Sequence, residues 1–560
     1  MKKTIWIVAA AILLLSLLAG CRTKPADVPG TDTGTEEPTT AVTDSGEILL
    51  ERQKETPYVI IVGKNADEQE TEAANRLYKA FRQYLQLSLP VRIDLIQESS
   101  GFVESPYEIL VGDTSRAESE AWGKNMRAGD YRIRKAGTKL VIIGASPEST
   151  GKAVDAFVDR FLKSANGTLR ITDADAVSVT GDYPVPSFTV DGTELCEMTV
   201  AWSGKGRLNE LSAELLATAL TECYGYAAKA LPAYQAGNGR RLRAVTVAEL
   251  PELAGLLGDN AAVLTAADGN PVLLARDAAS LTGAMRTLAA ALRTTGSLSL
   301  ESGRTALRMN PGDTMSVLSF NLYGGADYDN RKNAVLNVIA TYLPDTFGIQ
   351  EGKDAWVNFF ASALSEYYAQ VGLGNQEDGY TETFNHIYYR KDRFNLIEGG
   401  TIWLSDNIHE AGSKLPESKR VRIATYALLE DRESGKRLLH VNTHLDNQSA
   451  LAREKQLNIV MRLISSFDAP CVLTGDFNSV PGSSVYAMAT SVMTDARVNA
   501  AERDTAPTYN GLGSSSHILD YCFFSQNRFE LLRYRVHDKL YQGNIYPSDH
   551  NAILVEYRIR

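Results

Sequence analysis

Residues 471–478 read Cys-Val-Leu-Thr-Gly-Asp-Phe-Asn, an apolar run typical of a strand that leads into Asp476 and Asn478. A strand end is a rigid place from which a β-scaffold usually presents functional side chains. Similar polar groups adjoin apolar runs elsewhere after residue 314, namely Asn321, Gln350-Glu351, Asn442-Thr443-His444, Asp520-Tyr521 and Ser548-Asp549-His550. The C-terminal half is therefore predicted to alternate strands with the side chains of a polar site.

These side chains are carboxylates, amides and two histidines, and they suit the hydrolysis of a phosphate ester. That reaction needs a cation to neutralise the phosphoryl oxygens, a positioned water and hydrogen-bond donors for the developing charge. Mg²⁺ takes one or two carboxylates and keeps several waters, whereas zinc requires several His or Cys ligands together. Glu351 fits the magnesium description, and all seven histidines lie after residue 312.

The polar groups occur in the order of the motifs of the endonuclease/exonuclease/phosphatase superfamily, which residues 313–560 resemble. Three further stretches match its blocks: Leu445-Asp446, the segment 387–394 and the segment 422–426. The resemblance implies an α/β catalytic domain of four layers, with two packed β-sheets flanked by helices.

The resemblance also implies how the metal and the substrate are held. Glu351 would bind Mg²⁺ or Mn²⁺, with Asn321 and Asp549 near the metal or the phosphate. Arg422 would bind substrate at the rim of the site, although a structural salt bridge is an alternative for this residue.

Five residues are implied to carry the catalytic steps. Asp476 would orient the attacking water, while His444 and Asn478 would bind the scissile phosphate and stabilise the transition state. His550, oriented by Asp520, would act as a base or stabilise charge, because an aspartate fixes the tautomer of its histidine and raises its basicity. Whether His550 or Asp476 takes the proton of the water is left open.

The substrate is predicted as a class, with a phosphodiester favoured over a monoester. Tyr323 stands where the DNA-repair branch of the superfamily has a second acidic residue, and residues 313–560 contain 24 Lys and Arg against 30 Asp and Glu. Nucleic acid is therefore expected at most as a substrate, since nothing drives non-specific binding to it. Phospholipid head groups and sugar or inositol phosphates are the other candidates.

The N-terminus resembles that of a bacterial lipoprotein. Lys2 and Lys3 precede an apolar run that ends in Leu18-Ala19-Gly20-Cys21, which predicts a signal peptide over residues 1–20 and lipidation of Cys21. An uncleaved anchor helix is the alternative. Residues 21–56 are predicted to be a flexible tether, because they contain few large apolar side chains. The folded part is expected outside the cytoplasm, anchored to the membrane by lipid.

The region between the tether and the catalytic domain is predicted to hold two small α/β repeats, at 57–180 and 186–307. Gly137 and Gly269 align at an offset of 132 residues, as do Thr150 and Thr282, but beyond them the apolar positions match only after a slip of one residue. Chance similarity between amphipathic helices is the alternative. The first repeat weakly resembles small domains that precede the catalytic domains of some extracellular glycoside hydrolases.

A second interpretation of the whole chain is a surface binding protein, whose repeats bind a glycan or cell-wall polymer and whose C-terminal domain is inactive. The intact motifs argue against it. The net charge of −11 supplies no general attraction to nucleic acid or anionic lipid. Four cysteines besides Cys21 are expected to be core thiols, with a Cys196–Cys223 disulfide as the alternative.

Overall fold

The computed structural model describes residues 46–94, 104–196, 198–237, 239–310, 312–379 and 382–560. The predicted signal peptide, Cys21 and most of the predicted tether lie outside these residues. Within the described part of the chain, none of the helices combines the length and the apolar character needed to cross a membrane.

The C-terminal domain is built on two β-sheets. Along the first sheet, from edge to edge, lie β20 (Tyr368–Val371), β21 (Ile387–Arg390), β19 (Thr346–Gln350), β18 (Met315–Asn321), β30 (Ala552–Ile559), β29 (Phe529–His537) and β27 (Glu502–Arg503). Along the second lie β22 (Phe394–Trp403), β23 (Ile423–Asp431), β24 (Arg437–His444), β25 (Cys471–Asp476), β28 (Asp520–Ser525) and β26 (Met493–Asp495).

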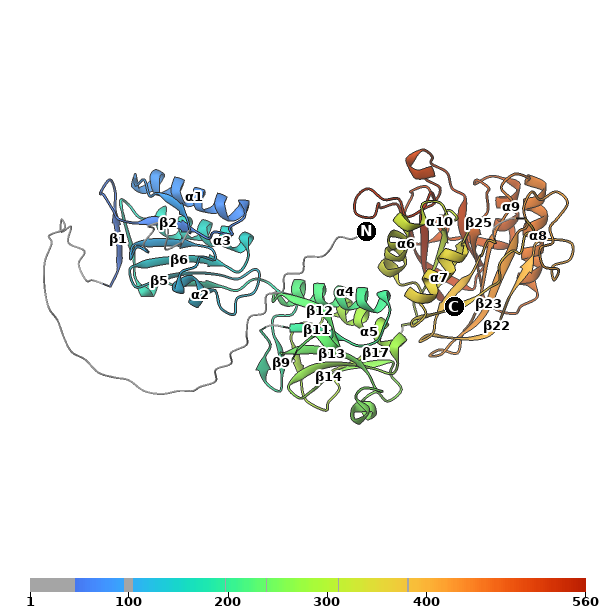
Figure 1. The fold of residues 1–560 in the computed structure, drawn as a ribbon, viewed down its shortest axis with the longest axis horizontal. Coiled ribbons are helices and arrows are strands. Elements are labelled where there is room, and N and C mark those ends of the chain that lie inside the picture. Colours follow the sequence, from blue (N-terminus) through green and yellow to red (C-terminus); the bar gives the residue numbers. More distant parts are fainter. Residues whose placement is uncertain (1–45, 95–103, 197, 238, 311, 380–381) are drawn as a thin grey trace, which may run out of the picture. The chain divides into compact units, whose positions relative to one another are not determined.

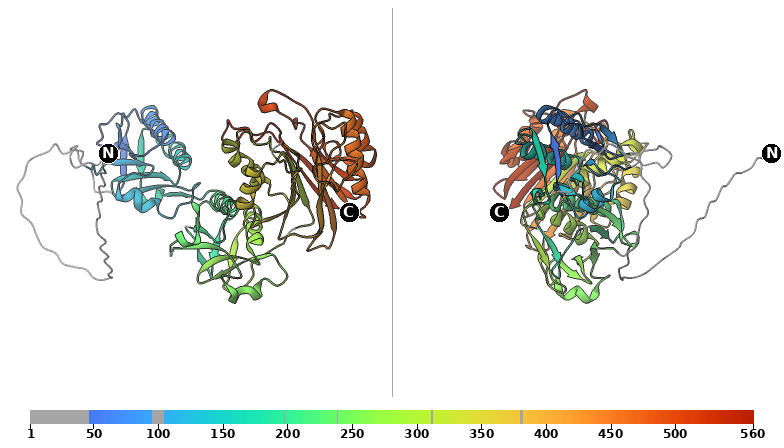
Figure 2. Two further views of the ribbon diagram at one scale, coloured as in Figure 1. Left: turned by 45° about the vertical axis from the view of Figure 1, so that its right-hand side comes forward. Right: turned by 90° about the vertical axis from the view of Figure 1, so that its left-hand side faces the viewer.

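Apolar side chains fill three layers of core around these sheets. Val317, Val472 and Val555 belong to the core between the sheets. The outer face of the first sheet is covered by α6 (Tyr328–Tyr342) and α7 (Asp354–Ala363), and that of the second by α8 (Ala450–Ser465) and α9 (Ser484–Val492). Figures 1 and 2 show these helix pairs on opposite sides of the strands. The predicted four-layer α/β fold is confirmed.

Strand pairing brings the motif residues to the same end of the strands in both sheets, which we call one edge of the domain. Asn321 pairs with Gln350 across parallel strands, and His444 pairs with Asp476 in the same way. Asp520 is opposite Asp476 in an antiparallel pair. Asp520 therefore begins a strand, whereas the sequence analysis placed it after one, and the antiparallel direction of β28 is what returns it to this edge.

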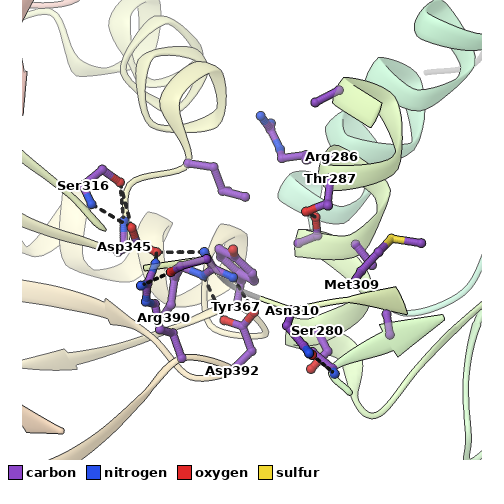
Figure 3. Close-up of a pocket in the computed structure, with 18 of the residues that line it drawn as sticks. Ser280, Arg286, Thr287, Met309, Asn310, Ser316, Asp345, Tyr367, Arg390 and Asp392 are labelled. Carbon is purple, nitrogen blue, oxygen red and sulfur yellow. Dashed lines mark hydrogen bonds and ion pairs between the residues drawn. The ribbon is translucent and has the colours of Figure 1, made fainter. Parts of the chain in front are cut away.

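An ion-pair network closes the opposite edge. It consists of Asp345, Asp392, Asp431, Arg390 and Arg393, and we call it the arginine cluster. Asp345 accepts from Arg390 at 2.8 Å and from Arg393 at 3.0 Å, as well as from the backbone N–H of Ser316 at 2.7 Å (Figure 3). Arg390 also pairs with Asp392 and Arg393 with Asp431, so each charge has a partner of opposite sign.

Two six-stranded sheets precede the catalytic domain and have the same strand order. The first is β3 (Val91–Ile93), β2 (Val59–Val62), β4 (Glu108–Val111), β6 (Lys139–Gly144), β5 (Tyr131–Ala136), β8 (Val177–Val179). The second is β12 (Ala228–Pro232), β11 (Met198–Trp202), β13 (Arg241–Thr246), β15 (Asn270–Ala275), β14 (Ala262–Ala267), β17 (Leu307–Met309).

Corresponding neighbours in the two sheets also run in the same relative directions. α1 (Glu68–Leu85) and α3 (Pro147–Phe157) pack on the first sheet, as α4 (Arg207–Tyr224) and α5 (Ala278–Ala291) do on the second (Figure 1). This likeness supports the interpretation as two copies of one unit, which stays a prediction.

The offset between the two units is 131 residues rather than the predicted 132 at the hairpin. β5 begins at residue 131 and β14 at residue 262, and the helix caps Ser146 and Asp277 are separated by the same amount. The glycines misled the alignment because Gly137 is the first residue of its two-residue turn and Gly269 is the second.

One further expectation is corrected, and one alternative is not found. The tether predicted over residues 21–56 ends sooner, because β1 (Ile48–Glu51) pairs with β7 (Thr168–Ile171) and buries Ile48 and Leu50. The Cys196–Cys223 disulfide is absent from the described structure, where both cysteines are free thiols.

Candidate active site

The polar side chains at the edge formed by β18, β24, β25 and β28 converge on Asp476. We call the converging set the active-site cluster: Asn321, His444, Asp476, Asn478, Asp520 and His550. Asn321 Nδ2 donates to Asp476 Oδ2 at 3.0 Å, and the backbone N–H of Asn478 donates to Asp476 Oδ1 at 2.8 Å. The Nε2 atoms of His444 and His550 lie 3.4 and 3.8 Å from Asp476 Oδ2.

Asp476 is nearly inaccessible to solvent, with 2 % of its surface exposed. Burial and the neighbouring Asp520 carboxylate raise the pKa of Asp476 to about 7, although His550 opposes the shift. A buried carboxylate with that pKa is held close to the point at which it can exchange a proton at neutral pH.

His550 forms a short hydrogen bond with Asp520, at 2.8 Å between Nδ1 and Oδ2. Burial would lower the pKa of His550, but Asp520, Asp476 and Asp549 outweigh it and raise the pKa to about 10. The Tyr509 ring packs edge-on against the imidazole, with centroids 4.9 Å apart. His550 is therefore a fixed, positively charged donor beside Asp476.

His444 and Asn478 form a second pair next to Asp476. Asn478 Nδ2 lies 3.0 Å from His444 Nε2 and also donates to the carbonyl oxygen of Leu445 at 3.1 Å. Burial, with Arg422 and His550 nearby, holds the pKa of His444 well below its usual range. His444 is thus neutral while His550 is charged.

Glu351 and Asp549 lie beside this cluster, on loops that are tied to one another. Glu351 follows β19 with a φ of 57°, and the loop after β18 approaches so closely that a Cβ on Gly324 would lie 3.5 Å from its carboxylate. Ser548 Oγ donates to the carbonyl oxygen of Asn321 at 2.7 Å, which fixes the start of the Asp549 segment.

The donor set fits a hard divalent cation. Burial raises the pKa of Asp549, the charged His550 opposes the shift, and the nearby Glu351 carboxylate raises the pKa further, so two carboxylates adjoin each other here. Together with the Asn321 amide, these are the oxygen ligands that Mg²⁺ and Mn²⁺ prefer. Among the described residues, Asp476, Asp520 and His550 form a group of three potential metal ligands. Their ligand atoms all lie within 4.8 Å of one another. The predicted ligands Glu351 and Asp549 are outside that group.

Arg422 lies between the cluster and Glu351 without a hydrogen bond to its Nε atom in the described part of the chain, although this atom is buried. Glu351, Asp476 and Asp446 are the carboxylates that act on its charge. The neighbouring Arg420 differs, because it donates to Glu377 at 2.9 Å. A buried donor without an acceptor favours the predicted substrate contact of Arg422 over a structural salt bridge.

Sequence reasoning missed Arg331, which holds two loops of the site together. Its guanidinium donates to the carbonyl oxygens of Leu322 at 3.1 Å and of Pro547 at 2.6 Å. The sequence contained one signal, an arginine on the apolar face of α6, where it is buried.

Sequence reasoning also gave no role to the amides of Gln350 and Asn442, which link the two sheets close to the active-site cluster. Gln350 Nε2 donates to Asn442 Oδ1 at 2.7 Å, and Asn442 Nδ2 donates to the Ile349 carbonyl at 2.7 Å. A Cβ on Gly348 would lie 2.4 Å from Asn442, so glycine is required for this approach.

Comparison with known proteins finds one family. The model of the Endonuclease/Exonuclease/phosphatase family matches residues 318–550. No curated protein matches the chain.

Solved structures similar to the C-terminal domain include the endonuclease/exonuclease/phosphatase from Bacteroides vulgatus (25% identity, TM-score 0.42, covering 44% of this chain and 99% of that one). A mannosyl-6-phosphatase from Bacteroides thetaiotaomicron is 23% identical, with a TM-score of 0.40 and coverage of 43% and 99%. The human Nocturnin catalytic domain with bound sulfate is 18% identical, with a TM-score of 0.36 and coverage of 45% and 97%.

Proposed function

Because residues 318–550 match the model of the Endonuclease/Exonuclease/phosphatase family, we propose that this protein is a Mg²⁺- or Mn²⁺-dependent hydrolase of phosphate esters, acting outside the cytoplasm and preferring phosphodiesters. One observation carries the proposal. A buried aspartate, Asp476, receives hydrogen bonds from Asn321 and Asn478 and lies between a neutral His444 and a charged His550.

Glu351, Asp549 and the Asn321 amide would hold the ion, which supplies charge neutralisation at the phosphoryl oxygens. Asp476 would orient the attacking water. Its pKa of about 7 and the charge on His550 support Asp476 over His550 as the acceptor of the water's proton. His550 would then donate a charge-assisted hydrogen bond to the phosphoryl group, and its bond to Asp520 would keep the ring in place.

Asn478 and Arg422 supply further donors for the phosphate. Asn478 is held in position by the carbonyl of Leu445, and the Arg422 Nε–H is buried with no acceptor of its own. Donors fixed in advance stabilise developing charge without reorganisation during the reaction. The alternative of a binding protein with an inactive domain finds no support in a site whose charged groups are all present.

The test is hydrolysis of an aryl phosphodiester and its monoester by the full-length protein with Mg²⁺, with Mn²⁺ and with EDTA. We expect turnover that EDTA removes and that is lost in Asp476→Ala. The Glu430→Gln variant is a matched control, because Glu430 lies at the far end of β23 from the site. Turnover that persists in Asp476→Ala or with EDTA would contradict the proposal.

The location rests on the N-terminal sequence, in which a basic start and an apolar run precede Cys21. We expect the protein in the membrane fraction of a bacterial host, labelled by a fatty acid. The Cys21→Ser variant should lose the label, and a label that remains in this variant would contradict lipidation at Cys21.

A further inference from the structure

A cavity of about 240 Å³ lies next to Glu351 in the catalytic domain. Its walls come from the segment between β20 and β21, which carries Asn375, Glu377 and Asn385, and from residues 420–423 at the start of β23. Since Glu351 also belongs to the proposed metal site, a group in this cavity would be attached to the phosphate that reacts there.

The polar lining of the cavity is fixed by its own hydrogen bonds. Asn375 accepts from the backbone N–H of Thr383 at 2.9 Å and donates to the Val421 carbonyl at 3.3 Å. Asn385 Nδ2 donates to the Ile423 carbonyl at 3.3 Å. Both asparagines are buried, as is Glu377. Side chains held in this way are arranged before a ligand arrives, which lowers the entropy lost on binding.

The lining carries charges of both signs, with Lys353, Arg420 and Arg422 against Glu351 and Glu377. Arg420 pairs with Glu377 at 2.9 Å, and Lys353 donates to the hydroxyl of Thr383 at 2.9 Å. Burial lowers the pKa of Lys353, while Glu351 opposes the shift. Arg422 is already assigned to the reacting phosphate and the two other cations are engaged by these contacts, so a second phosphate would need a further cation. Hydroxyl groups, each both donor and acceptor, suit this mixed lining better.

The size and composition of the cavity restrict the group further. Pockets for drug-sized ligands occupy about 300–1,000 Å³, and this cavity is smaller. No Phe, Tyr or Trp lies among its lining residues, so the described residues provide no ring on which a nucleobase could stack there. A single ring with several hydroxyl groups meets both restrictions.

We infer that this cavity binds the alcohol part of the substrate, and that this part is one polyhydroxylated ring, a monosaccharide or an inositol. The inference rests on the proposed function and narrows its substrate class. Glu377 is the specificity residue, because its carboxylate is buried and is held by Arg420 at the cavity wall.

The test compares kcat/KM of the full-length protein for glucose 6-phosphate, inositol 1-phosphate and phenyl phosphate, and for the methyl diester of each. At least one polyol ester should have a higher kcat/KM than the phenyl ester of the same type, monoester or diester. Glu377→Gln should lower kcat/KM for the preferred polyol ester by roughly 10- to 100-fold, the value of one or two hydrogen bonds to a charged group, with a much smaller loss on the phenyl ester. The two polyols distinguish a sugar from an inositol ligand.

Two further variants make the result independent of folding. Asn447 is exposed at the cavity, so Asn447→Trp narrows the cavity with little risk to the fold, and it should reduce the polyol preference. Glu430→Gln, at the other end of β23, should leave kcat/KM for the polyol and the phenyl esters unchanged. Thermal unfolding of each variant confirms that the protein compared is folded.

The outcomes separate the two proposals. Equal losses on polyol and phenyl esters in Glu377→Gln, or a preference of the unmodified protein for the phenyl esters, would overturn the cavity assignment and leave the phosphoesterase intact. No turnover of any ester with either metal would overturn the proposed function, and the cavity assignment with it.

Discussion

Two aspartates at opposite edges of the catalytic domain differ in how their charge is balanced. Asp345 in the arginine cluster and Asp476 in the active-site cluster are both buried, with 5 % and 2 % of their surfaces exposed. Burial raises the pKa of each, but Arg393 and Arg390 outweigh it at Asp345 and lower its pKa, whereas Asp520 adds to it at Asp476. The arginine cluster pairs its charges and holds strands together, whereas Asp476 keeps a raised pKa because it is buried and a second carboxylate adjoins it.

The largest effect expected from this difference is on catalysis. Asp476→Asn removes the carboxylate at the centre of the active-site cluster and should lower kcat/KM by about 10⁴-fold, the upper range for one acid–base group. Without metal the loss of stability should be smaller than that at Asp345, because relief of the repulsion with Asp520 offsets the hydrogen bond from Asn321 or Asn478 that the new amide cannot accept. A variant that loses stability and keeps activity would reverse the roles of the two edges.

At Asp345 the main effect is expected on stability rather than on catalysis. Asp345→Asn leaves the buried Arg390 and Arg393 without their shared carboxylate and should lower the free energy of unfolding by about 3–5 kcal/mol. Denaturant titration measures the loss. The folded fraction should retain its turnover per molecule, and a loss of less than about 1 kcal/mol would show that the arginine cluster is not a stabilising one.

Metal binding should stabilise one edge and leave the other unaffected. At a concentration of 100 times its Kd, Mg²⁺ or Mn²⁺ should add about 2.7 kcal/mol to the free energy of unfolding. Glu351→Gln should remove this increment, because Glu351 is the proposed ligand, whereas Asp392→Asn in the arginine cluster should preserve it. An equal increment in both variants would place the metal elsewhere.

A smaller effect, on the pH dependence of stability, is expected at His440, whose pKa is shifted by burial alone. Burial lowers the pKa of His440 to about 3, and its Nε2 lies 2.9 Å from the Thr474 hydroxyl. The neutral ring therefore stabilises the fold above pH 6.5, and this contribution is lost as the pH falls from 6.5 towards 3.

Between pH 7 and pH 5 the loss should be roughly 2 kcal/mol from His440 alone. Unfolding measured at the two pH values should show a smaller difference in His440→Gln by that amount. An unchanged difference would mean that folding does not lower the pKa of His440.

The sequence allowed much of the fold and the active-site cluster to be predicted, because the relevant residues are contiguous with strands. Asp476 and Asn478 follow an apolar run whose pattern is visible without a structure. The four-layer fold is confirmed, while the catalytic roles stay predictions. Asp520 shows the limit: its place next to Asp476 depends on the antiparallel direction of β28, which the local sequence does not specify.

Residues that act through contacts distant in sequence were not predicted. Arg331 joins carbonyl oxygens of residues 322 and 547, and Glu377 meets Arg420 from a loop without periodicity. Arg331 has one local signal, its place on the apolar face of α6, but at neither position does the local sequence show which partner the side chain meets. In both cases the partner is supplied by tertiary packing.

The pairing of β1 with β7 has a consequence for shortening the protein. A chain that begins at residue 57, the start predicted for the first repeat, would lack β1 and leave Leu169 and Ile171 of β7 without the strand that covers them. An uncovered strand edge is a template for pairing with other chains. Such a truncation should aggregate, whereas one that begins at residue 46 keeps the edge covered.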